Sequence, residues 1–164
     1  MEYEISGGSF PTVICTLQKG ETMKDESGAM AFMTSNIKME TNTGGGLIKG
    51  LGRALSGDTI FLNFFTAESD NQKIAFSACY PGKIIPRKLT GSNTIIGEKN
   101  AFLAAEESVD MDIYFKKKFK VGLFGGEGLF FTKLTGPGKV WIQTMPISKL
   151  ADAIIPYIPE PKTE

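Results

Sequence analysis

The residues of this chain that could do chemistry are carboxylates, lysines, glycine-rich loops and two cysteines, since the sequence contains no histidine. The absence of histidine excludes Ser-His-Asp and Cys-His nucleophile arrangements and every metal site with an imidazole ligand. Glu106 and Glu107 could form an acid/base pair, but neighbouring residues on a strand point apart, which favours two turn carboxylates. Asp110-x-Asp112 lacks the further ligands and the distal Glu of a calcium loop. We therefore predict no catalytic residue, no metal ligand and no cofactor, and a protein that is not an enzyme.

The glycine-rich stretch Val121–Phe131 interrupts a strongly apolar run with four glycines and one acid, Glu127. A loop of this kind could cradle a phosphate, which requires a helix after it and usually a Lys. The residues that follow, Leu129-Phe130-Phe131-Thr132, favour a strand instead. We predict a tight corner that joins two strands.

The densest positive charge in the chain is the basic run of Lys116, Lys117, Lys118 and Lys120, which surrounds Phe119. Lysines around an aromatic ring can bind single-stranded nucleic acid. The chain has 18 Lys plus Arg and 18 Asp plus Glu, so no general attraction to polyanions is expected. In a neutral protein, such a run is more often a solvated loop or a strand edge, where lysines discourage edge pairing. We keep these four lysines as a candidate binding surface for nucleic acid.

Two other features indicate binding. Aromatic residues such as Phe64, Phe76 and Trp141 could line a pocket for a small ligand between two sheets. The segment Leu47–Leu55 has apolar residues at helical spacing with two cations off that stripe, so it could pack on the sheet or a neighbouring subunit, or touch a membrane surface. No apolar run is long enough to span a membrane, and the first residues contain no secretion signal, so we expect a cytoplasmic protein.

The elements that must position these residues are short apolar runs separated by Gly, Pro, Asn, Asp and Ser. This rhythm predicts an all-β fold, either a sandwich or a barrel. A short helix is expected over Lys149–Ile155, ended by Pro156. The length fits one domain, residues 1–156, followed by a frayed tail at 157–164. Cys15 and Cys79 stand among apolar residues, which favours buried free thiols.

Several short motifs together resemble one family. They are Tyr3-Glu4-Ile5, Glu26-Ser27-Gly28-Ala29-Met30, Met39-Glu40-Thr41, Tyr80-Pro81-Gly82, Phe102-Leu103-Ala104-Ala105-Glu106, Phe124-Gly125-Gly126-Glu127-Gly128-Leu129-Phe130 and Thr135–Ile147. On these residues the chain resembles the bacterial and archaeal relatives of the mitochondrial biogenesis "altered inheritance of mitochondria" proteins, in the TRAP-like superfamily.

The resemblance implies a β-sandwich related to a short double-stranded β-helix, with one or two short helices. It also implies two related halves, each with its own copy of the Phe102–Glu106 and Phe124–Phe130 motifs, whereas this chain has each motif once. We therefore expect that an internal segment has been lost near Gly125–Thr135 and that self-association replaces the missing packing partner. The eukaryotic members suggest a scaffold. We predict a non-enzymatic homo-oligomer that acts by self-assembly or by binding a protein partner.

Overall fold

The computed structural model describes residues 1–26, 28–42, 62–78, 80–116, 129–145 and 147–159. Five features named above lie partly or wholly outside these residues. They are the segment Leu47–Leu55, the predicted buried thiol of Cys79, the glycine corner Gly125–Gly128, most of the basic run after Lys116 and the end of the predicted tail, residues 160–164.

Thirteen strands make up the described chain, and all their pairings are antiparallel. They are β1 (Glu2–Ser6), β2 (Thr12–Leu17), β3 (Thr22–Glu26), β4 (Met30–Met33), β5 (Ile37–Asn42), β6 (Leu62–Ala67), β7 (Gln72–Ser77), β8 (Ile84–Leu89), β9 (Thr94–Glu98), β10 (Phe102–Glu106), β11 (Asp110–Lys116), β12 (Leu129–Thr135) and β13 (Gly138–Gln143). A 3-10 turn, η1 (Lys99–Ala101), precedes β10; helix α2 (Ile147–Ile154) and a second 3-10 turn, η2 (Ile155–Tyr157), follow β13. The all-β prediction is confirmed, and the predicted C-terminal helix is present but begins two residues earlier.

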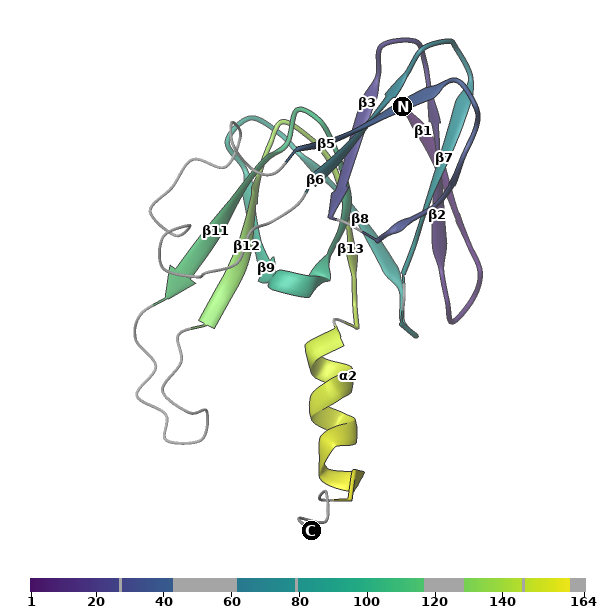
Figure 1. Cartoon of the computed structure of the whole chain (residues 1–164). Helices are drawn as coiled ribbons and strands as arrows, with labels where there is room; N and C mark the ends of the chain where they lie inside the picture. The colour runs from purple at the N-terminus through teal and green to yellow at the C-terminus, as the bar shows by residue number, and fades with distance from the viewer. Residues whose placement is uncertain (27, 43–61, 79, 117–128, 146, 160–164) are drawn as a thin grey trace.

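The strands form three sheets. Sheet A has the order β1-β2-β7-β4, sheet B the order β5-β6-β3-β10-β13-β8, and sheet C the order β11-β12-β9. Figure 1 shows β9, β11 and β12 on one side of the molecule and β1, β2 and β7 on the other, with β3, β6 and β13 between them. The structure therefore contains a third sheet in addition to the two sheets of the predicted sandwich.

Sheet B has apolar residues on both faces, and each face belongs to a separate core. One core joins Val13 and Phe76 of sheet A to Phe65 of sheet B. The other joins Phe64 of sheet B to Leu134 of sheet C. Phe64 and Phe65 are neighbours on β6, so the period of two along a strand sends one ring to each core. For this reason the residues of β6 are buried in a row, from Leu62 to Phe65, instead of alternating between buried and exposed.

Gly138, at the start of β13, is a position where the fold requires glycine. Its φ of +142° lies in a region that side chains rarely adopt. An added Cβ would lie 2.7 Å from Ser108 Oγ and 2.7 Å from Val109 Cγ2. Gly8 also has a positive φ, +57°, but nothing lies within 4 Å of its added Cβ.

We predict that Gly138→Ala lowers the free energy of unfolding by about 3 kcal/mol or more, because backbone strain and overpacking add. Gly8→Ala is the matched control and should cost about 1 kcal/mol, from strain alone. Urea unfolding of the two variants measures the difference. Equal losses would show that the close approach of Ser108 and Val109 is not a constraint.

Candidate functional site

The basic run predicted as a binding surface is only partly described by the structure. Lys116 is the last residue of β11, and Lys117, Lys118 and Lys120 lie outside the described residues. A nucleic-acid surface at these four lysines therefore stays a prediction.

The aromatic residues predicted to line a ligand pocket are core residues. Phe76 and Trp141 have no exposed surface and pack between sheets A and B. Phe64 is 7% exposed and packs in the other core, between sheets B and C. The three rings therefore share no pocket, because sheet B separates Phe64 from the other two. The predicted aromatic pocket was wrong in this respect.

A small cavity of about 150 Å³ does exist elsewhere, between β3, β6 and the turn that connects β10 to β11. Its lining includes the side chains of Lys24 and Leu62 together with residues 107–111. Ligand pockets for molecules of drug size occupy roughly 300–1,000 Å³. This cavity has room for about five water molecules at about 30 Å³ each.

Lys24, which borders the cavity, is a charged residue that the sequence analysis did not single out. Its side chain is 4% exposed, and Nζ donates hydrogen bonds to the backbone carbonyls of Val109 and of Glu107, the latter at 3.1 Å. Burial lowers the pKa of Lys24, while the nearby charges of Asp110 and Glu107 oppose this shift. These two hydrogen bonds connect β3 to the turn between β10 and β11.

Asp25, the next residue on β3, is fully buried and points to the opposite face of sheet B. Its Oδ1 accepts a hydrogen bond from Asn63 Nδ2 at 3.0 Å, and its Oδ2 accepts one from the backbone N–H of Met30 at 3.0 Å. Thr41 donates its hydroxyl to Asn63 Oδ1 at 2.9 Å. The chain of bonds joins β5, β6 and β3 of sheet B to β4 of sheet A.

Burial raises the pKa of Asp25 from 3.8 to about 6, against the opposing effect of its hydrogen bonds to Asn63 and Met30. A raised folded-state pKa means that the folded protein holds the proton more tightly than the unfolded chain. The stability that the protonated carboxyl of Asp25 contributes is therefore present at low pH and is lost as the pH rises from about 4 through about 6.

We predict that Asp25→Asn removes this pH dependence. The difference in free energy of unfolding between the variant and the parent should change by about 2–3 kcal/mol between pH 4 and pH 7. The parent loses the most stability toward pH 7, where its buried carboxylate is charged. The amide of Asn63 can rotate to pair with the new amide, so the fold should be retained. Chemical denaturation at a series of pH values measures the effect, and two parallel stability profiles would contradict it.

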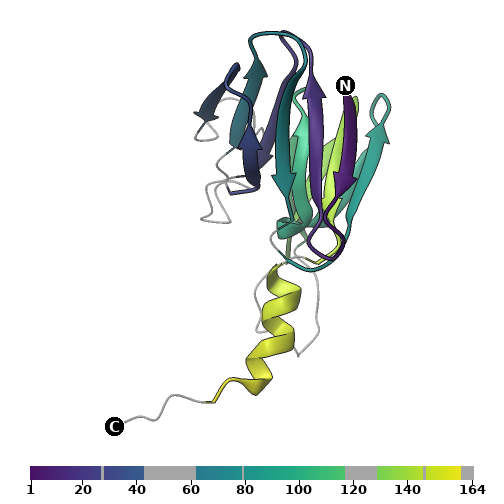
Figure 2. The same ribbon diagram turned by 90° about the vertical axis from the view of Figure 1, so that its right-hand side faces the viewer.

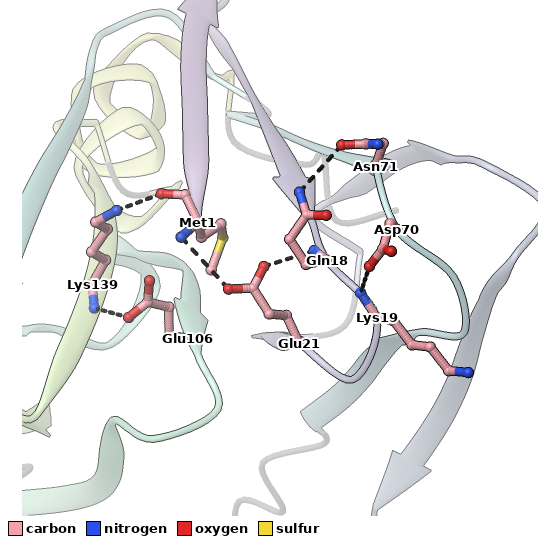
Figure 3. A network of polar contacts seen from close by, with 8 residues as sticks. All are labelled: Met1, Gln18, Lys19, Glu21, Asp70, Asn71, Glu106 and Lys139. Atoms are coloured by element: carbon pink, nitrogen blue, oxygen red, sulfur yellow. Dashed lines mark hydrogen bonds and ion pairs between the residues drawn. The ribbon is translucent and has the colours of Figure 1, made fainter.

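A second group of polar contacts surrounds the amino group of Met1 (Figure 3). The amino nitrogen lies 3.6 Å from Glu21 Oε1, and Lys139 Nζ donates to the carbonyl of Met1 at 2.6 Å. Glu106 Oε2 accepts from the backbone N–H of Lys139 at 2.8 Å. Lys139 Nζ also lies 5.7 Å from the centre of the Tyr3 ring. These contacts connect β1 of sheet A with β10 and β13 of sheet B.

Neither polar cluster has the features of a catalytic site. Cys15 is buried as a free thiol, as predicted, and burial raises its pKa to about 12, so the thiolate nucleophile is not formed at neutral pH. Within the described residues, no group of three or more Cys, Asp or Glu side chains could hold a metal ion. None of the helices in the described ranges is long and apolar enough to cross a membrane.

The sequence offered little sign of Lys24 or Asp25. Both partners of Lys24 and one partner of Asp25 are backbone groups, which leave no mark in the side-chain pattern. The sequence signal that could have indicated them is the position of the Lys-Asp pair within the seven residues between Gly20 and Gly28. A segment of that length can form a strand. If both faces of the strand are covered, two neighbouring charged side chains point into opposite cores.

The fold and these clusters define an all-antiparallel β protein in which the buried Lys24 and Asp25 connect neighbouring strands and turns. The chain belongs to the mitochondrial biogenesis AIM24 family, whose model matches residues 3–150. The family resemblance stated from the motifs is thereby confirmed.

Two proteins from Streptococcus pyogenes are similar to this chain. An uncharacterised protein of serotype M6 is 29% identical over 135 residues, which cover 77% of this chain and 52% of that protein. The chain thus spans about half the length of this curated relative. A crystal structure of an S. pyogenes protein matches 96% of this chain and 99% of its own with a TM-score of 0.61, and its 17% identity supports the fold alone. The loss of an internal segment stays a prediction.

Proposed function

We propose that this protein is a non-enzymatic assembly protein that works by self-association or by holding a protein partner, in the manner of a scaffold. The observation that carries the proposal is the apolar surface of its C-terminal segment. Figures 1 and 2 show α2 leaving the end of the sheets and pointing away from them. A segment that projects in this way is available for contact with another molecule.

The side chains at the end of this segment are large and apolar. Ile154 is 47% exposed, Ile155 59%, Tyr157 86% and Ile158 60%. Leu150 and Ile154 lie four residues apart, on one face of α2, and Ile155, Tyr157 and Ile158 follow the end of that helix. Scattered apolar residues are normal on a protein surface, but a group of this size is typical of an interaction site. Tyr is also enriched in protein interfaces.

The non-enzymatic part of the proposal is supported by the residue types. Histidine is absent from the sequence, and the thiol of Cys15 is protonated and buried. Lys24 and Asp25 are engaged by backbone or amide groups. The free thiol of Cys15 also fits a reducing compartment, so a cytoplasmic location remains part of the proposal.

A small-ligand function receives less support, because the aromatic residues that were to line its pocket are packed in two cores. Nucleic-acid binding rests on the four lysines of the basic run alone. Its test is the salt dependence of binding, which should be steep if phosphate contacts dominate.

We predict that the wild-type chain has a solution mass larger than a monomer and that this mass persists at about 1 M salt, because apolar contacts are not screened. Replacing Tyr157 and Ile158 together by Ser should reduce the mass or the binding of a partner without loss of β structure. Light scattering and circular dichroism measure the two effects.

The matched control is Lys88→Ser, which changes an exposed side chain on an edge strand and should leave the mass unchanged. A wild-type chain that is monomeric at every concentration would contradict self-association. A Tyr157/Ile158 variant with unaltered mass and unaltered partner binding would contradict the role of the C-terminal segment.

A further inference from the structure

The edge strand β5 carries an arrangement that fits a second copy of itself. In the described residues β5 pairs with β6 alone, so one side of its backbone has no strand partner there. Its sequence is Ile-Lys-Met-Glu-Thr-Asn, with the buried Ile37 followed by four exposed residues. Met39, in the middle, is 44% exposed.

The hydrogen-bond pattern tells which backbone groups of β5 face outward. The N–H of Glu68 donates to the carbonyl of Asn36 at 2.9 Å, so the backbone groups of Asn36 point toward the chain of β6. Backbone groups alternate in direction along a strand. Those of Lys38 and Glu40 therefore face β6, whereas those of Ile37, Met39 and Thr41 face away from it. These three residues can pair with another strand.

We propose that two copies of this chain associate through an antiparallel pairing of β5 with β5, around a two-fold axis at Met39. This inference rests on the proposed assembly function and names one interface for it. In this register Met39 lies opposite Met39 of the second copy, and Ile37 lies opposite its Thr41. In this register the hydrogen-bonded pairs between the two strands consist of Ile37, Met39 and Thr41, whose backbone groups face outward, as an antiparallel pairing requires.

The charges of β5 select this register. Lys38 and Glu40 lie on one face, where their side chains form an exposed ion pair of 2.9 Å within the monomer. Around Met39, Lys38 of each copy meets Glu40 of the other, and opposite charges in cross-strand pairs are favourable. If the two-fold axis moves by one residue along β5, to Lys38 or to Glu40, then that residue lies opposite the same residue of the second copy. Like charges directly opposite each other are unfavourable.

The edges at β8, β1 and β9 do not offer the same fit. On β8, the other edge of sheet B, Pro86 has no N–H, and Arg87 Nη1 donates to the carbonyl of Pro86 at 2.9 Å. On β1, self-pairing about its central residue would place Glu4 opposite Glu4. On β9 the single charge, Glu98, has no cation on its own strand to meet. Proline and charge on an edge strand are known to prevent pairing.

The test uses charge reversal at two exposed positions of the full-length chain. Glu40→Lys places two lysines opposite each other, and Lys38→Glu places two glutamates opposite each other. Each variant should raise the dissociation constant of the two-fold contact at least about tenfold, because two attractive pairs become repulsive. Analytical ultracentrifugation at low salt measures the constant, and circular dichroism checks that the fold is retained.

Two further samples make the test specific to this register. The double variant Lys38→Glu with Glu40→Lys exchanges the charges and should recover the wild-type mass. An equimolar mixture of the two single variants should also recover it, since the copy with two glutamates meets the copy with two lysines. The control Lys88→Ser on edge β8 should behave as wild type.

The outcomes separate this inference from the proposed function. If the wild type assembles and the single variants keep the wild-type constant, the β5 interface is overturned while assembly stands. If the single variants dissociate but neither the double variant nor the mixture recovers, pairing around Met39 is overturned. If the wild type is monomeric at all concentrations, both self-association and the second copy as the occupant of β5 are overturned.

Discussion

The structure depends on one constraint, which is that the central strands of sheet B have no free face. Sheet A covers one side of these strands and sheet C the other, so they must supply apolar side chains in both directions. The strand β6 meets this requirement by alternating residues such as Phe64 and Phe65, and β10 does so with a run of four buried residues. Packing of this kind is usual for sheets that are covered on both faces.

Charged side chains on the central strands of such a sheet are shielded from solvent. Lys24 and Asp25 are neighbours on β3, so one is buried in each direction. Each is satisfied by groups from another element, the turn after β10 for Lys24 and β4 for Asp25. A shift of β3 by one residue would exchange the two side chains and leave both without these partners. The pair therefore contributes to the register of the sheet as much as to its stability.

The same constraint determines which strands can be predicted from the sequence. The period of two and the turn residues were enough to predict strands such as Thr12–Leu17 and Ile37–Thr41, because those strands have one exposed face. They did not predict three sheets, since a run such as Leu62–Ala67 shows that both faces are buried but not what covers them. The proposed aromatic pocket failed for this reason, because Phe64 was assigned to the same interior as Phe76 and Trp141. Lys24 and Asp25 were missed because charged residues between two turns are ordinarily exposed.

With both faces of the central strands of sheet B buried, contact with another chain through this sheet is left to its two edges. These edges differ in chemistry. The edge at β8 has lost a donor at Pro86, and the carbonyl of the same residue is occupied by Arg87. The edge at β5 keeps the donors and acceptors of Ile37, Met39 and Thr41, and its two charges repel a copy of the strand in the neighbouring registers but attract it around Met39. The β8 edge is thus blocked from pairing, whereas the β5 edge favours pairing in one register. In this way a sheet can associate in a defined manner without open-ended aggregation.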